Sequence, residues 1–276
     1  MSETNWRRVK LGDYLSVLTD YHANGSYKKL KANVELLDTP NYAVMIRTTN
    51  FEKNDFTKDL KYITKSAYEF LHKSKVQSGD ILMNKIANAG SVYYMPDLHR
   101  PVSLAMNLFL LRTNKNNTNQ RYIYYYLKGT EKYIKQFAIG TATTTITKES
   151  VRNLEILLPP LPTQRKIAGI LSAYDDLIEN NTRRIEILEE MARSIYREWF
   201  VKFRFPGHES VKMVNSELGP IPEGWKLKTL ADLGLIHILS IQSVFCWQVI
   251  MPMAFSILSI LKGNSMRIRE PMLFVV

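Results

Sequence analysis

The chain has 276 residues and carries 37 Lys and Arg against 26 Asp and Glu, a formal net charge of +11. This length is sufficient for one or two domains with apolar cores. A single cysteine, Cys246, excludes a disulfide framework and a thiolate metal site. The opening residues, MSETNWRRVKLGD, lack the apolar core of a signal peptide, so we expect a protein of the reducing cytoplasm.

The positive charge is concentrated in the first part of the chain. Residues 1–158 hold 23 Lys and Arg against 14 Asp and Glu, whereas residues 159–203 hold seven of each kind. A basic region joined to a charge-balanced one suggests a polyanion as one partner and a protein as the other. An ordinary basic surface is the alternative.

The region 1–158 is predicted to have an α+β fold, because strands and short helices follow one another without regular alternation. A polar turn is expected around Asn24, Gly25 and Ser26. Short runs of β-prone residues predict strands at 42–47, 81–83, 92–94, 107–112 and 154–158. Apolar and aromatic spacing predicts helices at 66–72 and 120–137.

A proline cluster at 159–162 separates this region from a predicted long helix. Proline cannot continue a strand, but Pro162 can occupy the first turn of a helix, so we interpret the cluster as a rigid joint. The helix is expected to end near Phe203. Some forty residues at 1.5 Å each would span about 60 Å.

Along this helix, the seam residues recur with alternating steps of four and three, the pattern of a left-handed coiled coil. Asn181 is the only polar residue among them. An exposed seam needs a partner, and we predict an antiparallel, two-fold homodimer through 163–203. The seam consists of Ile167, Leu171, Tyr174, Ile178, Asn181, Ile185, Leu188, Ala192, Ile195 and Trp199.

Beyond the helix, Trp225, Leu230 and Asp232 repeat the spacing of Trp6, Leu11 and Asp13, which suggests an internal repeat after a loop over 206–224. The segment 235–261 then contains no Lys, Arg, Asp or Glu. A transmembrane helix and a buried element are two interpretations of this segment. Polar residues and Pro252 within it favour a third, a disrupted second domain over 235–276.

The sequence offers no catalytic motif. It contains no phosphate-binding G-x-x-x-x-G-K-[ST] loop, no G-x-G-x-x-G turn, no H-E-x-x-H and no G-x-S-x-G. The histidines lack metal-ligand spacing. Leu158 and Leu161 flank Pro159 and Pro160, so no side-chain amide stands beside the prolines to hold a target amino group. We therefore expect no catalytic residue, no metal site and no cofactor in this chain.

Candidate DNA contacts come from loops and strand ends. The hydroxyls of the loop 140–147 can bind phosphates or base edges, although a threonine strand with one solvated face is the alternative. Polar and basic residues at predicted strand ends often contact ligands. The predicted DNA-binding residues are Arg47, Asn50, Asn84, Lys85, Thr141, Thr143, Thr144, Thr145 and Lys148.

These features together resemble the specificity subunit of type I restriction-modification systems. The run from Leu158 to Ile167, LPPLPTQRKI, resembles the end of a target-recognition domain and the start of the spacer helix of that family. Further similar positions are Trp6, Leu11-Gly12-Asp13, Gly79-Asp80-Ile81-Leu82, Gly140-Thr141, Leu177-Ile178-Glu179-Asn180-Asn181 and Trp225. The resemblance extends over about residues 1–234.

The resemblance implies a non-catalytic DNA reader. Family members hold two recognition domains apart with two antiparallel helices, and each domain binds half of a split DNA site. Methyltransferase subunits supply the S-adenosylmethionine chemistry, and restriction subunits use ATP and Mg²⁺. The expected domains are 1–158 for recognition, 159–205 for the spacer helix, 206–234 for a linker and the start of a truncated second recognition domain, and 235–276 for an aberrant tail.

Two other classes of protein fit parts of the sequence. One is a DNA-binding regulator that dimerises by a coiled coil and has no enzyme partners. The other is a membrane-anchored interaction protein that uses 235–261.

Overall fold

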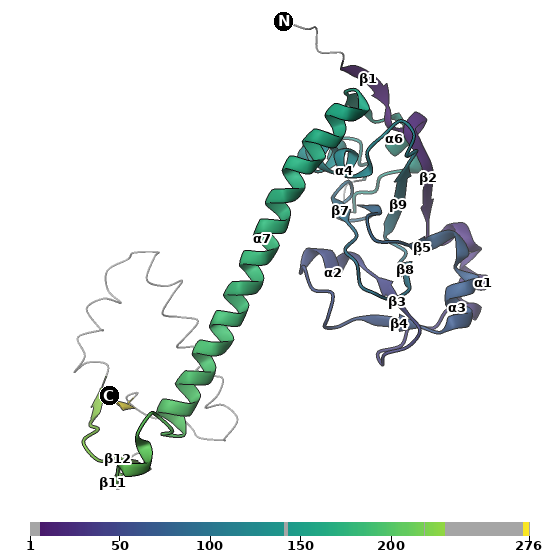
Figure 1. Ribbon diagram of the computed structural model, residues 1–276. Coiled ribbons are helices and arrows are strands. Elements are labelled where there is room, and N and C mark those ends of the chain that lie inside the picture. The colour runs from purple at the N-terminus through teal and green to yellow at the C-terminus, as the bar shows by residue number, and fades with distance from the viewer. Residues whose placement is uncertain (1–5, 141–142, 218, 230–272, 276) are drawn as a thin grey trace, which may run out of the picture. The chain divides into compact units, whose positions relative to one another are not determined.

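The chain forms two compact units, Met1–Glu179 and Asn180–Val276, in a computed structural model (Figure 1). The structure describes residues 6–140, 143–217, 219–229 and 273–275. The predicted segment 235–261 and the predicted DNA contact Thr141 lie outside these described residues.

Two four-stranded sheets organise the first unit. The first sheet is antiparallel throughout and consists, in order, of β2 (Leu15–Asp20), β9 (Leu108–Thr113), β6 (Ile81–Asn84) and β7 (Val92–Tyr94). The second sheet contains one parallel pair, β3 with β8, and runs β4 (Lys61–Ile63), β3 (Ala43–Ile46), β8 (Val102–Leu104) and β5 (Lys75–Val76). Separately, β1 (Arg7–Lys10) pairs antiparallel with β10 (Glu155–Leu158).

Short helices connect and cover these strands. They are α1 (Tyr27–Asn33), α2 (Thr48–Glu52), α3 (Lys65–Phe70), α4 (Gln120–Gly129), α5 (Glu131–Lys135) and α6 (Lys148–Asn153). Side-chain caps define several starts: the hydroxyl of Thr64 accepts from the amide of Ala67, and Thr147 accepts from the amide of Ser150.

The main core lies between the first sheet and α4. Phe109 and Leu111 of β9 pack in one buried cluster with Ile123 and Leu127 of α4, and the same cluster includes Ala168 of the long helix. A second cluster joins the two sheets through residues such as Leu82 and Leu110 on one side and Ile46 and Leu104 on the other. The long helix is therefore rooted in the core of the first unit.

The predicted strands all form. The structure has one strand at each of the ranges 42–47, 81–83, 92–94, 107–112 and 154–158, and no strand end differs from its predicted position by more than one residue. Three expectations were wrong in detail. The predicted helix 120–137 is two helices divided at Thr130, and Thr48–Asn50 belongs to helix α2, where we expected an open strand end. The loop over 206–224 contains a hairpin of β11 (Met213–Ser216) and β12 (Gly219–Pro222).

The predicted long helix is α7 (Leu161–Tyr196), followed by a π-helical turn over Arg197–Val201. Phe203 has a positive φ of 54°, a backbone conformation that cannot extend a right-handed helix, so the helix ends where the sequence predicted. In the second unit, the indole of Trp225 contacts the rings of Phe200, Phe203 and Phe205 at centroid distances of 5.5 to 5.7 Å. Among the described residues, no helix is long and apolar enough to cross a membrane.

Candidate nucleic-acid interface

One buried carboxylate binds both of the predicted DNA-binding lysines. Asp20, the last residue of β2, lies 3.2 Å from the ammonium nitrogen of Lys85 and 2.8 Å from that of Lys148. Burial alone would raise the pKa of the Asp20 carboxyl, but the bonds to Lys148 and Lys85 outweigh burial and lower it. Two ammonium groups around one carboxylate leave a net positive charge at this point of the surface.

The loop after β6 pairs with the threonine-rich segment. The carbonyl of Thr144 accepts a hydrogen bond from the amide of Ala87 at 2.9 Å, and the Thr144 hydroxyl donates to the carbonyl of Ala87 at 2.6 Å. The amide of Ile146 donates to the carbonyl of Lys85 at 3.0 Å. Lys85 thus lies in one connected patch with Thr144, Thr145 and Lys148, although about sixty residues separate it from them in the sequence.

The two predicted asparagines are buried and have structural partners. The side chain of Asn84, 2% exposed, accepts a hydrogen bond from the hydroxyl of Thr48 at 3.1 Å. Asn50, 3% exposed, accepts from the amide of Arg47 at 3.0 Å and donates to the carbonyl of Asp55. These contacts fasten α2 to the end of β6 and leave neither amide on the surface.

Arg47 remains a candidate for an anion contact. Its terminal nitrogen donates to the carbonyl of Asp59, while Nε is buried and has no hydrogen-bond partner among the described residues. Of the threonines, Thr143 and Thr145 are exposed, whereas the hydroxyl of Thr144 is engaged by the backbone of Ala87. The members of the predicted set that reach the surface, wholly or in part, are therefore Arg47, Lys85, Thr143, Thr144, Thr145 and Lys148, and the side chain of Lys85 is only 16% exposed.

The sequence prediction missed a second basic surface. Helices α1 and α3 pack together through Leu30 and Ala67, and lie side by side in Figure 1. Lysines are exposed on both helices and on the turn after α3, and the ring of Tyr27 on α1 is 72% exposed. The exposed lysines are Lys28, Lys29, Lys31, Lys65 and Lys73. Three lysines within four residues of α1 were the available signal in the sequence.

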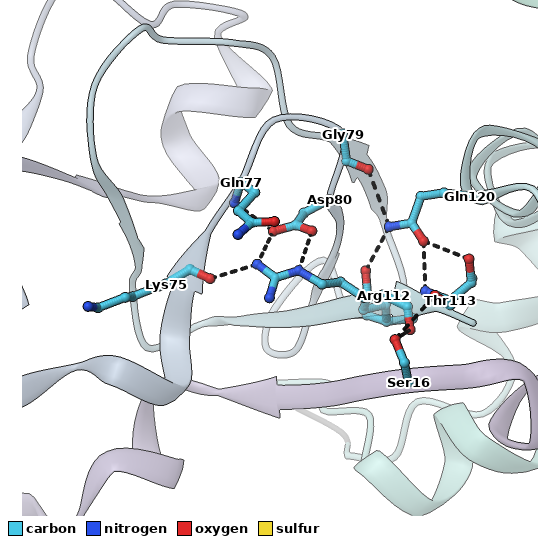
Figure 2. Close-up of polar contacts among 9 residues, drawn as sticks. Ser16, Lys75, Gln77, Gly79, Asp80, Arg112, Thr113 and Gln120 are labelled. Carbon is cyan, nitrogen blue, oxygen red and sulfur yellow. Dashed lines mark hydrogen bonds and ion pairs between the residues drawn. The ribbon is translucent and has the colours of Figure 1, made fainter. Parts of the chain in front are cut away.

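A buried ion pair holds the two sheets together (Figure 2). Arg112 of β9 donates two hydrogen bonds to the carboxylate of Asp80, at 2.6 and 2.7 Å, and a third to the carbonyl of Lys75 in β5 at 2.9 Å. The same carboxylate accepts from the amide of Gln77 at 2.7 Å. Since β9 and β5 belong to different sheets, this pair fixes the second sheet, against which α1 and α3 pack, to the first sheet.

The network continues to α4, as Figure 2 shows. Gln120, at the start of α4, accepts from the amide and hydroxyl of Thr113 at 2.7 and 2.8 Å, and donates to the carbonyl of Gly79 at 3.3 Å. Gly79 has a φ of 84°, and a Cβ there would lie 3.2 Å from the hydroxyl of Tyr94, so glycine is the residue that fits this turn. The Gly79-Asp80 pair noted in the sequence is thus part of the scaffold.

Helix α7 is attached to α4 and to the loop before it. The buried side chain of Gln164 accepts from the amide of Asn119 and donates to the carbonyl of Pro159, both at 2.8 Å. Further along, the hydroxyl of Tyr125 donates to Asp175 at 2.6 Å. Burial, followed by this bond to Asp175, raises the pKa of Tyr125 to about 12.

Side chains that could hold a metal ion are not clustered in the described part of the chain: no group of three or more His, Cys, Asp or Glu residues has suitable geometry there. The arrangement offers cationic and hydroxyl groups on a rigid two-sheet scaffold, followed by a long helix. These are the groups and the scaffold of a binding protein for a polyanion.

Comparison with known proteins defines the family. The type I restriction modification DNA specificity domain matches residues 3–190, and the chain belongs to this family. A Methanocaldococcus jannaschii protein, described as the MjaX type I restriction enzyme specificity subunit, is 32% identical over 247 residues, which cover 87% of this chain and 55% of that protein. The MjaVIII specificity subunit of the same organism is 28% identical over 233 residues, or 83% of this chain and 50% of the relative.

The fold agrees with this assignment. The crystal structure of a type I restriction-modification S subunit from M. genitalium superposes with a TM-score of 0.56 at 15% identity, over 83% of this chain and 53% of that one. The predicted class, a mixed α/β recognition domain followed by a long helix, is confirmed. The chain spans about half the length of the curated relatives that it matches first.

Proposed function

We propose that this chain reads one half of a split DNA site as a specificity subunit of a type I restriction-modification complex. The observation that carries the proposal is the patch in which Lys85 and Lys148 meet around Asp20, connected to Thr144 and Thr145, on a domain of the specificity family. The lysines would contact phosphates, and the threonine hydroxyls would contact phosphates or base edges.

The lysine-rich surface of α1 and α3 supports the same proposal. The clustered ammonium groups around the exposed Tyr27 can neutralise phosphates of a DNA backbone. Such contacts release counterions from the DNA and supply much of the binding affinity. The ion pair between Asp80 and Arg112 would keep this surface in a constant position relative to the patch around Asp20. Both contact regions would then act on one duplex as a rigid unit.

The partners and cofactors follow from this function. Modification subunits would bind the protein and supply S-adenosylmethionine-dependent methyl transfer, and restriction subunits would add translocation and cleavage with ATP and Mg²⁺. The chain itself would contribute recognition and a scaffold without catalysis, and the complex would act on chromosomal DNA in the cytoplasm.

Methylome sequencing of cells with and without the gene tests this proposal. We expect one split adenine-methylation motif to disappear on deletion and to return when the gene is supplied again. An unchanged methylome, together with DNA binding by the purified chain, would instead support the coiled-coil regulator.

Purified protein gives a second test. Lys148→Ala and Lys85→Ala should weaken binding to duplex DNA in fluorescence anisotropy and reduce the salt dependence, by about 0.9 in the log–log slope for each phosphate that the variant no longer neutralises. Lys115→Ala is the matched control, since Lys115 is an exposed lysine outside both basic surfaces. Equal binding by all three variants would exclude the patch as the contact region.

A further inference from the structure

A small ladder of three backbone segments adjoins the patch around Asp20. Ile86 and Thr145 form an antiparallel bridge, and Thr145 forms a second one with Ile139. In the second bridge the amides of Ile139 and Thr145 each donate to the carbonyl of the other residue at 2.8 Å. Residues directly opposite one another in antiparallel segments have side chains on the same face. Ile86, Thr145 and Ile139 therefore form one row of β-branched side chains, with Thr145 in the middle.

This row lies on the face of the ladder that points away from the core. Ile146, the residue after Thr145, is 2% exposed and belongs to the main core cluster, and Ala138, before Ile139, packs against the same cluster. Because side chains alternate between the two faces of an extended segment, the row occupies the outer face. Ile139 is 70% exposed, Thr145 is exposed and Ile86 is half-buried. The ladder thus presents aliphatic groups to solvent next to the cationic patch.

The backbone holds Ile139 in a defined position. Gly140 follows it with a φ of 125°, and a Cβ on this residue would clash with the carbonyl oxygen of Thr143, so only glycine allows this turn. At the other edge of the ladder, two hydrogen bonds join Thr144 to the backbone of Ala87. An exposed isoleucine is by itself ordinary on a protein surface. This one is preorganised, so a contact made by it would cost little additional ordering.

Basic groups flank the segment that carries Ile86. Lys85 directly precedes Ile86 and belongs to the patch around Asp20. The ammonium nitrogen of Lys135 donates to the side chain of Asn88, two residues after Ile86, at 2.9 Å. Phosphate contacts by these ammonium groups would fix the position of the aliphatic row over the bases.

Reading a DNA sequence needs a group that the lysines and hydroxyls do not supply. Ammonium groups bind phosphates, which carry no sequence information, and threonine hydroxyls bond to donors or acceptors on any base. The side-chain amides of Asn50 and Asn84, a type of group that can read adenine, are buried within the fold. An aliphatic side chain does discriminate, because the 5-methyl group in the major groove belongs to thymine alone.

We infer that Ile139, the exposed end of this row, enters the major groove and contacts the methyl group of a thymine in the DNA half-site. The inference rests on the proposed function and assigns a base-reading residue to it. The width of the ladder favours this groove. Two strand spacings of about 4.8 Å give about 10 Å between the outer backbones, which matches a major groove of about 12 Å and exceeds a minor groove of about 6 Å.

Selection from a pool of duplexes with a random central segment, by the purified full chain, identifies the half-site. We expect an invariant thymine in it. Each thymine of the selected duplex is then replaced in turn by deoxyuridine, which removes the methyl group and keeps the base pairing. At one position this replacement should weaken binding about fourfold in fluorescence anisotropy, the factor for exposing one buried CH₂ group. A selected site without thymine, or equal affinity for every deoxyuridine duplex, would overturn the inference.

Variants of Ile139 show whether this side chain makes the contact. Ile139→Ser should bind the thymine duplex at least about fourfold more weakly than the parent protein and lose no further affinity with deoxyuridine, as expected for groups in direct contact. Its melting curve should match that of the parent protein, because the side chain is 70% exposed. Ile139→Val, which keeps the β-branch, should retain the deoxyuridine effect. Ile170→Ser, which replaces a half-exposed isoleucine of α7, is the matched control and should bind like the parent protein.

Salt dependence separates this contact from a phosphate contact. Ile139→Ser should keep the log–log slope of the parent protein, because an aliphatic contact releases no counterions. A deoxyuridine effect that persists in Ile139→Ser would overturn the inference. So would weaker binding by Ile139→Ser when the parent protein is indifferent to deoxyuridine, which is the result for an apolar wedge in the minor groove.

These outcomes distinguish the inference from the proposed function. A defined selected duplex to which deoxyuridine makes no difference would exclude Ile139 as a reader of thymine and leave DNA recognition standing. A pool in which no duplex is enriched would count against sequence recognition by this chain, and so against both.

Discussion

The ion pair between Asp80 and Arg112 predicts a large loss of stability when one partner is neutralised. In Asp80→Asn the guanidinium keeps its charge, but a neutral amide replaces the carboxylate that accepts two of its hydrogen bonds. One amide N–H would then point toward a guanidinium N–H, so at least one of the two short hydrogen bonds cannot form.

The magnitude follows from burial. The Asp80 side chain is 5% exposed and that of Arg112 is 27% exposed, so the pair is largely but not fully removed from water. Breaking a fully buried pair costs about 3–5 kcal/mol. Because water reaches part of the guanidinium, we expect about 2–3 kcal/mol for Asp80→Asn, which corresponds to a fall of about 5–10 °C in the melting temperature.

Thermal and urea unfolding, followed by circular dichroism, measure this loss. Asp38→Asn is the matched control. Asp38 also forms an ion pair, with Lys61, but its side chain is 82% exposed, and we expect a change below about 0.5 kcal/mol in the free energy of unfolding. The double variant D80A/R112A should cost less than the sum of the two single variants, as expected for groups in direct contact. Equal melting temperatures for Asp80→Asn and Asp38→Asn would refute the reasoning.

Three further predictions concern the Asp20 clamp, a close backbone contact and the base of α7. Asp20→Asn should lower the free energy of unfolding at pH 7. Because the folded pKa of this carboxyl lies below its unfolded value of about 3.9, the difference from the parent protein should persist above that pH and vanish as the pH falls through the folded pKa. Urea midpoints from pH 7 to pH 2 measure this difference. Gly12→Ala should destabilise the fold by about 1–3 kcal/mol, because its Cβ would lie 2.9 Å from the carbonyl oxygen of Arg152. Gly169→Ala, in a part of α7 with open space around it, should stabilise the fold by up to about 1 kcal/mol. A lower melting temperature for both variants in calorimetry would contradict this. Gln164→Ala should lower the free energy of unfolding by about 2–3 kcal/mol, because the buried backbone amide of Asn119 would lose its hydrogen-bond acceptor. Arg165→Ala is the control, and equal urea midpoints for the two variants would argue against this prediction.

Local patterns in the sequence predicted five strands and the long helix but not β2, β4, β5 and β8. The strands at 81–83 and 92–94 were found because short runs of aliphatic and aromatic residues were bounded by Gly and polar residues. The long helix and its end near Phe203 followed from periodicity and from the proline cluster. Helix α2 was missed because its five residues carry too few periodic positions to be distinguished from a loop.

The candidate site was predicted only in part. Lys85 and Lys148 were chosen for their charge, and the structure places them together, but nothing in the sequence indicated Asp20 as their common partner. Asn50 and Asn84 were chosen as polar residues near strand ends, yet the packing of α2 on β6 buries them and uses their amides within the fold. Whether a polar side chain is a surface contact or a structural bond depends on neighbours that are distant in the sequence.

Local patterns were enough to predict five of the strands, the long helix and its apolar seam. Each of these depends on residues within about a dozen positions, where spacing decides which side chains share a face. The folded chain was needed to show how the two sheets meet through Asp80 and Arg112, and which lysines surround Asp20. Those contacts join segments 32, 65 and 128 residues apart, and their free energies arise from burial and charge pairing, which no local pattern encodes.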